Sequence, residues 1–224
     1  MKIVFPPLYA IIDASLLETS ELRFAEALAE SGVELLQYRH KQATSRQLFD
    51  SSRALSSRLS EFQSSTGRAV RFVVNDRPDI AVLVKAGGVH VGQTDLGVEE
   101  ARAIVGHAGP GSGCWVGVST HTLAQVEAAE RTSADYVAFG PVFATATKEN
   151  PDPTVGLVLL NQARAATTKP LVAIGGITLE RASEVYRAGA DSVAVARDLI
   201  AAPDPAARAR AFLAVAAGRA HAAQ

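Results

Sequence analysis

Short apolar runs alternate with helix-length amphipathic segments along the chain, and this alternation constrains the fold most. A run of roughly four to eight apolar residues between turn signals predicts a buried strand, and strands that alternate with helices favour parallel βα units. The eight predicted strands are Leu8 to Ile12, Glu34 to Arg39, Arg71 to Asn75, Gly88 to Val91, Trp115 to Val118, Tyr136 to Phe139, Leu171 to Ile174 and Ser192 to Ala196.

Segments long enough for helices fill the intervals between these strands. The first helix is expected to begin after a capping residue, Thr19 or Ser20. Eight strands with intervening helices favour a single (β/α)8 TIM barrel over residues 1–224, with a frayed tail after about residue 218. The further predicted helices are Ser45 to Ser64, Pro78 to Ala86, Val98 to Val105, Leu123 to Arg131, Gly156 to Ala166, Leu179 to Ala188 and Ala206 to Ala217.

The main alternative fold is an open, doubly wound sheet. Its nucleotide-binding form carries Gly-x-Gly-x-x-Gly directly after the first strand. Here the sequence Asp13-Ala14-Ser15-Leu16-Leu17 follows instead, so the barrel is favoured.

Charge and cysteine content exclude several classes of protein. A net charge of −1, from 22 basic and 23 acidic residues, gives no field that would gather nucleic acid or an anionic membrane. A single cysteine, Cys114, excludes an intramolecular disulfide framework and a multi-cysteine metal site within one chain. The apolar run before Pro6-Pro7 is too short for a signal peptide or membrane span. We expect a soluble, cytoplasmic protein. The sequence leaves open whether it forms a homo-oligomer.

The segment Gln37-Tyr38-Arg39-His40-Lys41 carries polar residues at every second position. Alternate side chains of a strand point to one face, so Gln37, Arg39 and Lys41 are expected to converge. An amide that can read a heterocycle edge, beside two cations that can hold phosphates, indicates a site for an anionic, ring-bearing substrate. The alternative is a charged strand edge exposed to solvent.

Polar residues follow the third, fourth and fifth strands, where a barrel of this kind builds its active site. Asp76 and Asp95 are candidate Mg²⁺ ligands, because Mg²⁺ is usually held by one or two carboxylates together with substrate phosphates. Each acid could instead only cap a helix. His121 beside Ser119 is either a proton carrier or a hydrogen-bonding element of the loop.

Two glycines and a long loop mark the other side of the expected mouth. Gly175-Gly176 permits close backbone approach after the seventh strand, near the usual phosphate site of such barrels. The composition of the loop from Ala144 to Val155 suits a cover that keeps water from the reacting groups. An ordinary surface loop would have the same composition. Cys114 has no evident base beside it, which favours a buried structural thiol.

Six motifs follow one another at the predicted strand ends. They are Gln37-x-Arg39-x-Lys41, Asn75-Asp76, His90-Val91-Gly92-Gln93-x-Asp95, Gly117-Val118-Ser119, Gly140-Pro141-Val142-Phe143-x-Thr145-x-Thr147-Lys148 and Ile174-Gly175-Gly176-Ile177. In this order, over Leu8 to about Leu199, they resemble the thiamine phosphate synthase family.

The resemblance implies a Mg²⁺-dependent transferase that joins hydroxymethylpyrimidine diphosphate to thiazole or carboxythiazole monophosphate, through a dissociative, carbocation-like step. Small phosphorylated substrates would be its only implied partners. Asp76 and Asp95 would bind Mg²⁺, and Arg39, Lys41, Ser119 and Lys148 would be catalytic. The residues implied in substrate binding are Gln37, Tyr38, Arg39, His40, Lys41, Asn75, Ser119 and Lys148 for the pyrimidine diphosphate, and Thr145, Ala146, Thr147, Gly176, Ala196 and Arg197 for the thiazole phosphate.

The chain departs from this family at Arg197, where relatives often carry a small serine. A contact through backbone amides at a helix N-terminus would tolerate the change, and the cation could aid phosphate binding, unless Asp198 neutralises it. Two rival functions remain: a thiazole tautomerase of the same superfamily, which has no diphosphate to bind, and a non-catalytic barrel that binds a phosphate ester.

Overall fold

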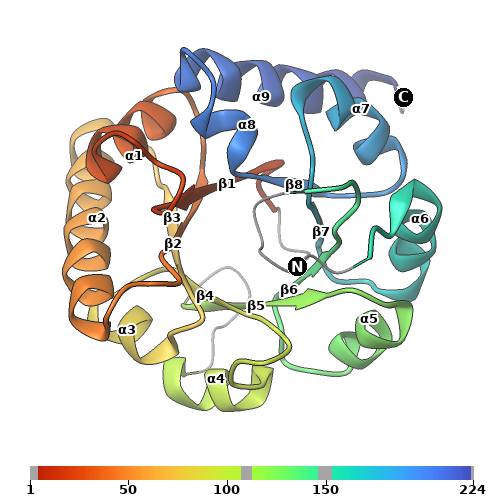
Figure 1. Cartoon of the computed structure of the whole chain (residues 1–224), viewed down its shortest axis with the longest axis horizontal. Coiled ribbons are helices and arrows are strands. Elements are labelled where there is room, and N and C mark those ends of the chain that lie inside the picture. Colours follow the sequence, from red (N-terminus) through yellow and green to blue (C-terminus); the bar gives the residue numbers. More distant parts are fainter. Residues whose placement is uncertain (1–4, 107–112, 146–152, 223–224) are drawn as a thin grey trace.

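Eight parallel strands close into a barrel in the order of the sequence, as the alternating pattern predicts. The computed structural model describes residues 5–106, 113–145 and 153–222. Figure 1 looks down the barrel, with the strands at the centre and a ring of helices outside. The strands are β1 (Leu8–Asp13), β2 (Leu35–Arg39), β3 (Arg71–Asn75), β4 (Gly88–Val91), β5 (Trp115–Thr120), β6 (Tyr136–Phe139), β7 (Leu171–Ile174) and β8 (Ser192–Val195).

Each predicted helix is present, and one short helix is additional. The first begins after Ser20, one of the two expected caps, although no hydrogen bond from the Ser20 side chain closes it. The addition is a single turn, α8, after β8. The helices are α1 (Glu21–Glu30), α2 (Ser45–Thr66), α3 (Pro78–Leu83), α4 (Val98–Val105), α5 (Leu123–Glu130), α6 (Gly156–Ala166), α7 (Leu179–Arg187), α8 (Arg197–Ile200) and α9 (Pro205–Ala222).

The largest differences from the sequence-based expectation lie at the ends of α3 and α9, and the other helix ends differ by two residues or fewer. The helix α3 ends at Leu83 rather than Ala86, and Lys85 then takes a positive φ of 55° that turns the chain toward β4. The last helix runs to Ala222, past residue 218 where fraying is expected. The apolar pattern continues past Leu83 through Val84 and Ala86, and α9 is rich in alanine to its end, so periodicity alone does not mark where either helix ends.

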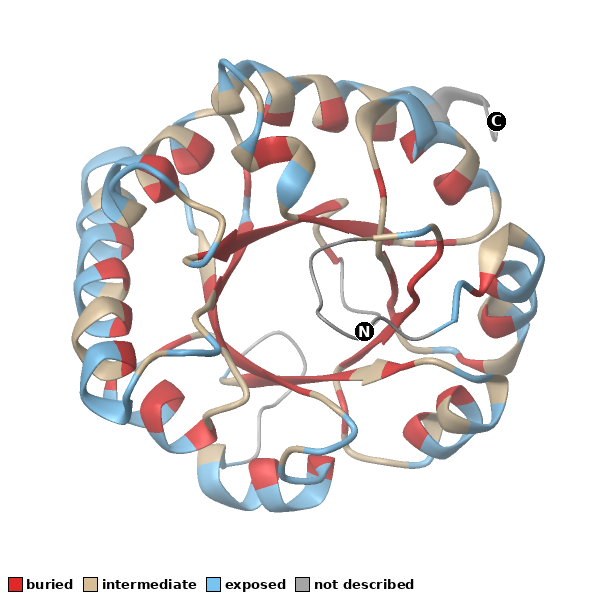
Figure 2. Cartoon of the chain, viewed as in Figure 1, coloured by how far each residue is buried: buried red, intermediate tan, exposed pale blue. Residues whose placement is uncertain are grey.

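Side chains alternate between two apolar layers. On β2, Leu36 and Tyr38 face the helices and belong to the large core between sheet and helices, whereas Leu35 belongs to a smaller cluster inside the barrel. Figure 2 shows the same division, with the strands buried and each helix buried along the side that faces them. This burial of both strand faces is what near-continuous apolar runs predict.

The barrel interior is filled from its amino-terminal end by aromatic rings. Phe5 stacks on Trp115 with ring centroids 5.3 Å apart, and Tyr136 lies 5.0 Å from Phe5. Gly117, on the neighbouring strand, leaves the room that the Tyr136 ring occupies, because a Cβ at Gly117 would lie 2.0 Å from Tyr136 Cζ. The glycine in this motif is therefore a packing requirement of the interior.

Gly117→Ala is expected to lower the free energy of unfolding by roughly 3 kcal/mol, because overpacking a rigid interior forces side chains and backbone to shift. Urea denaturation measures this change. The matched control is Gly218→Ala on the exposed face of α9, where nothing lies within 4 Å of the added Cβ. That change should be neutral or stabilise by up to about 1 kcal/mol. Equal stability of the two variants would contradict the packing role.

Candidate active site

Strand alternation on β2 separates the residues of the expected polar triplet from their neighbours. Gln37 is buried inside the barrel, 3% exposed, and Arg39 lies at its mouth. Tyr38 points the other way, where its hydroxyl donates to Glu21 of α1 at 2.7 Å and lies 3.3 Å from His40 Nδ1. The structure thus places Arg39 at the pocket and Gln37 inside the barrel beneath it, and leaves Tyr38 and His40 on the helix-facing side.

A hydrogen-bonded series of polar side chains crosses the barrel interior from Gln37 to Ser119. Gln37 Nε2 donates to the Tyr9 hydroxyl at 2.6 Å, which lies 2.9 Å from the Tyr136 hydroxyl. Tyr136 Oη is 3.0 Å from His90 Nδ1, and His90 Nε2 is 2.9 Å from Ser119 Oγ. We call these five side chains the interior relay. The sequence alone assigned no role to Tyr9, Tyr136 and His90, because a single polar residue within an apolar run gives no sign that it has a polar partner on another strand.

Arg39 is held in place by an acid at the end of β1. Its guanidinium pairs with Asp13 Oδ2, and Asp13 Oδ1 accepts from the amide and the hydroxyl of Ser15 at 3.1 and 2.6 Å. Asp13 is 1% exposed, and a buried carboxylate needs such partners. The pair fixes the guanidinium at the pocket wall. Sequence reasoning missed Asp13, which register alone brings opposite Arg39.

The two candidate metal ligands meet beside Lys41. Lys41 Nζ pairs with Asp76 Oδ2, and Asp95 lies close enough to Asp76 to raise its pKa. The amide of Gly92 donates to Asp95 Oδ2 at 2.8 Å. Asp76 has a positive φ of 63°, a conformation that aspartate tolerates better than most residues. Asn75 precedes it at the end of β3.

Burial and the neighbouring charge of Asp95 raise the pKa of Asp76 to about 6, while Lys41 acts to lower it. Two carboxylates at close range are costly to ionise together unless a cation stabilises them. One or two carboxylates are also what Mg²⁺ takes from a protein when substrate phosphates complete its shell. This pair of acids therefore fits Mg²⁺. No group of three or more His, Cys, Asp or Glu side chains gathers as a metal site among the described residues.

His121 has a structural task at the mouth. Its Nδ1 lies 2.6 Å from the carbonyl oxygen of Gly140, which can only accept, so Nδ1 carries the proton. Its backbone amide donates to Gln125 Oε1 at 2.7 Å. The hydrogen-bonding interpretation of His121 is the one that this geometry favours. It is His90 that contacts Ser119.

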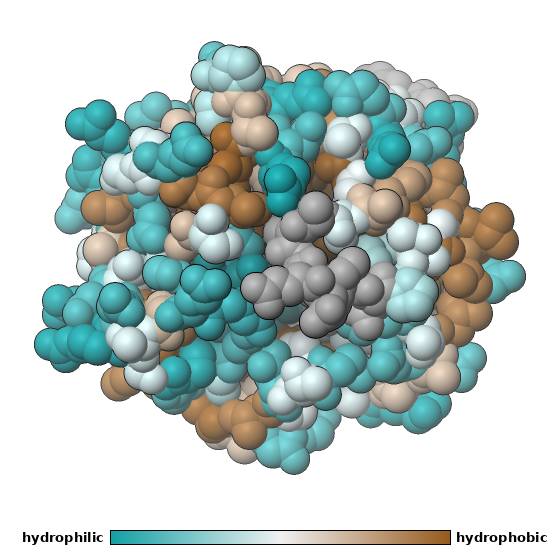
Figure 3. Space-filling model, viewed as in Figure 1, coloured by the Kyte–Doolittle hydropathy of each residue, from teal (hydrophilic) through white to brown (hydrophobic). Residues whose placement is uncertain are grey.

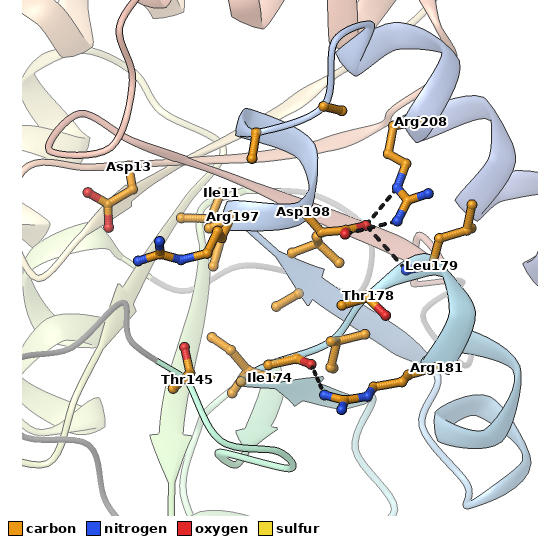
Figure 4. Close-up of a pocket in the computed structure, with 18 of the residues that line it drawn as sticks. Ile11, Asp13, Thr145, Ile174, Thr178, Leu179, Arg181, Arg197, Asp198 and Arg208 are labelled. Atoms are coloured by element: carbon orange, nitrogen blue, oxygen red, sulfur yellow. Dashed lines mark hydrogen bonds and ion pairs between the residues drawn. The ribbon is translucent and has the colours of Figure 1, made fainter.

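A pocket of about 1050 Å³ opens at the carboxyl ends of the strands and reaches from Arg39 and Ser119 to Arg197 and α9. Apolar side chains of Ile11 and Ile174 line its wall. Figure 4 shows Ile11 and Ile174 around this space, with Arg197 beside it. In Figure 3 hydrophilic side chains gather on this face beside the residues drawn in grey.

Gly175 and Gly176 let two loops approach each other at the pocket. Their φ values are 98° and 62°, and a Cβ at Gly176 would lie 2.4 Å from the carbonyl oxygen of Ala144. Arg181 braces the same loops, because it donates to the carbonyl of Gly176 at 3.0 Å and stacks over the Phe143 ring at 4.5 Å. The glycine pair is thus required by backbone geometry, as the sequence predicts.

The turn after β8 is held by a charged network. Asp198 accepts two hydrogen bonds from Arg208 of α9, at 2.8 and 2.9 Å, and one from the amide of Leu179 at 3.2 Å. Arg208 also pairs with Glu180 at 2.9 Å. In Figure 4 the Arg197 side chain points away from Asp198, toward the side where Asp13 is drawn. The carboxylate of Asp198 is therefore committed to Arg208.

The remaining predicted residues divide between the pocket, the part of the chain that is not described and a site away from the pocket. Thr145, Ala196 and Arg197 line the pocket with Gly176. Ala146, Thr147 and Lys148 lie outside the described residues. Cys114 lies before β5, away from the pocket, and burial raises the pKa of its thiol to about 11, which agrees with a structural thiol.

A family model described as thiamine monophosphate synthase matches residues 8–199, which cover all eight strands. The chain belongs to this family. The thiamine monophosphate synthase family is one of transferases, and the order of its motifs along the chain is the order in which β2 to β7 deliver the site residues.

Curated relatives agree over nearly the full length. A thiamine-phosphate synthase of Koribacter versatilis is 45% identical over 213 residues, 93% of this chain and 94% of the relative. A thiamine-phosphate synthase of Chloroflexus aurantiacus is 42% identical, over 91% of this chain and 89% of its own.

A solved structure of thiamine phosphate pyrophosphorylase from Pyrococcus furiosus superposes with a TM-score of 0.80 at 29% identity, over 95% of this chain and 96% of that one. One from Bacteroides thetaiotaomicron has a TM-score of 0.67 at 18% identity and supports the fold alone. Within the described residues, no helix combines the length and apolarity needed to cross a membrane.

The Asp76 carboxyl is expected to titrate near pH 6 in the metal-free protein, as read by carbon-13 NMR. Asp95→Asn should lower this pKa by removing a negative neighbour, and Lys41→Met should raise it. Because the unfolded value is about 3.9, folding stability should fall as the pH rises from about 4 through 6, and Asp76→Asn should remove that fall. A midpoint at or below pH 4 would contradict this account.

Proposed function

We propose that this enzyme couples hydroxymethylpyrimidine diphosphate to a thiazole or carboxythiazole monophosphate and releases thiamine phosphate and pyrophosphate, with carbon dioxide also lost from the carboxythiazole. The observation that supports this most is the division of one mouth into two anion-receiving ends. Arg39, Lys41 and two acids lie at the ends of β2 to β4, whereas Gly176 and Arg197 lie at the pocket beyond β7 and β8.

The diphosphate end is assigned to the cationic side. Arg39 and Lys41 supply charge-assisted hydrogen bonds to phosphate oxygens, and Asn75 and Ser119 supply neutral ones. Each cation has a carboxylate partner, Asp13 or Asp76, which holds the side chain in position for an anion. Mg²⁺, when bound by Asp76 and Asp95, supplies stabilisation of the charge on the leaving pyrophosphate. Lys148 joins this set by the family resemblance.

The thiazole phosphate end is assigned to backbone amides. Gly176, Ala196, Arg197 and Thr145 line the pocket, where the amides of the first three and the hydroxyl of Thr145 would donate to the phosphate. Ala146 and Thr147 follow Thr145 and are assigned to the same end by resemblance. Binding at this end orients the thiazole nitrogen toward the reacting carbon of the pyrimidine.

The chemistry proposed is dissociative, and the site suits it. Departure of pyrophosphate leaves a pyrimidine-stabilised cation, which the thiazole nitrogen captures, so no protein nucleophile is needed. Ser119 does contact His90, but the third partner is Tyr136, a phenol whose pKa burial raises, rather than a carboxylate. A neutral phenol does not stabilise an imidazolium as a triad acid does. The apolar wall at Ile11 and Ile174 keeps water from the cation.

A coupling assay with both substrates, with and without Mg²⁺, tests the proposed reaction. Thiamine phosphate is read by the fluorescence of its oxidised form. Product should require Mg²⁺, and Asp95→Ala should lower the rate by about a hundredfold or more, because the metal supplies several kcal/mol of charge stabilisation. The control is Asp50→Ala on the exposed face of α2, which removes an acid outside the site.

Absence of product from folded protein would contradict the proposal. It would favour the tautomerase, which would convert the carboxythiazole phosphate without any diphosphate, or the phosphate-ester-binding barrel, which would bind without metal or turnover.

Arg197→Ser tests the departure of this chain from its relatives. If the guanidinium contacts the thiazole phosphate, the variant should raise the KM for that substrate about tenfold and leave the KM for the diphosphate unchanged, as loss of a charge-assisted hydrogen bond predicts. Arg210→Ser, on an exposed position of α9, is the matched control. An unchanged KM for the thiazole phosphate would show that only backbone groups bind it.

A further inference from the structure

The interior relay ends at the pocket. The direction of its hydrogen bonds therefore decides whether its last member, Ser119, is a donor or an acceptor toward the pocket. Its members come from five strands: Gln37 from β2, Tyr9 from β1, Tyr136 from β6, His90 from β4 and Ser119 from β5. Ser119 also lines the pocket. The inference that follows rests on the proposed function, which places a diphosphate beside Ser119.

Each inner member of the relay has one proton to donate along the series. Burial raises the pKa of both Tyr9 and Tyr136, so both phenols are neutral at physiological pH and donate one hydrogen bond each. A neutral imidazole donates from one ring nitrogen and accepts at the other. When His90 is neutral and every hydroxyl proton of the series is bonded within it, two arrangements remain, and they run in opposite directions.

The amide of Gln37 selects between these two arrangements. Its Nε2 donates to Tyr9 at 2.6 Å, so the Tyr9 proton is directed to Tyr136 and the Tyr136 proton to His90 Nδ1. His90 then carries its own proton on Nε2 and donates it to Ser119 Oγ, at 2.9 Å. The Ser119 hydroxyl accepts this bond and keeps its proton for a further acceptor.

We propose that Gln37 is a positioning residue that acts through Tyr9, Tyr136 and His90 to make the Ser119 hydroxyl a hydrogen-bond donor into the pocket. A diphosphate offers only acceptors, so a serine turned this way binds it. In the reverse arrangement Ser119 donates to His90 Nε2 and presents lone pairs to an anion, which repels it.

Two features hold Tyr136 and Ser119 where the relay needs them. Gly117 leaves the space in which Tyr136 reaches the relay, since a Cβ there would lie 2.4 Å from Tyr136 Oη. Gln93 Nε2 donates to the Ser119 carbonyl at 2.6 Å and fixes the backbone at the pocket end.

The tautomer of His90 gives the direct test. Nitrogen-15 NMR of the ligand-free protein distinguishes a proton on Nε2 from one on Nδ1, and His90→Gln assigns the signal. The wild type should carry the proton on Nε2. Gln37→Glu should move it to Nδ1, because an ionised carboxylate can only accept from Tyr9 and so reverses the series. The spectrum is recorded where the carbon-13 shift shows the introduced carboxyl ionised.

A double-mutant cycle keeps the proposal testable if Gln37→Glu does not fold. Tyr136→Phe should lower kcat/KM for the diphosphate substrate about tenfold to a hundredfold in the Ser119 background, the range for a hydrogen bond to a charged group. With Ser119→Ala already present, Tyr136→Phe should cause little further loss. Tyr186→Phe is the control, because it removes a buried hydroxyl that donates to Pro7, outside the pocket, and should leave both rates unchanged.

A proton on Nδ1 in the wild type, a proton that stays on Nε2 beside an ionised carboxylate in Gln37→Glu, or fully additive losses in the cycle would each overturn the proposal. The NMR arm needs no turnover, so it decides the relay even if the coupling assay gives no product. Failure of the proposed function and failure of this inference are therefore separate results.

Discussion

The parallel pairing of β1 with β8, which aligns Leu8 with Val193, is the contact on which the rest of the structure depends. It closes the sheet, so that the carboxyl ends of all eight strands meet around one mouth. Residues separated by more than 150 positions, such as Asp13 and Arg197, then line one pocket. A closed barrel also has an inner face without solvent, and there a polar side chain without a partner is costly. The interior relay and the Arg39–Asp13 pair both answer that requirement.

The strands could be predicted from the sequence because each is buried on both faces and reads as an apolar run. The segments between the strands are long enough for helices, and this alternation favoured a barrel. The single turn α8 could not be predicted as a helix, because four residues carry no periodicity. Ser20 could be predicted as the start of α1, but not the absence of a bond from its side chain. These misses are of local geometry, which tertiary packing decides.

The proximity of Asp76 and Asp95 could be predicted, because polar residues that follow neighbouring parallel strands meet at one mouth of the barrel. Proximity could not be predicted where polar residues lie within a strand. Tyr9, His90 and Asp13 become recognisable only when the register brings their partners opposite them. Tyr38 shows the reverse case, since its place in the motif suggests a site residue but alternation turns it to α1.

The ion pairs of Arg208 with Asp198 and Glu180 join α9 to α8 and α7. The short turn α8 has too few residues to be stable as a helix by itself, so its contacts with α7 and α9 fix its orientation. The last long helix of the chain thus does more than cover β1 and β8. It holds the turn whose residues Ala196 and Arg197 line the pocket, so a change in the packing of α9 would alter the position of that part of the pocket wall.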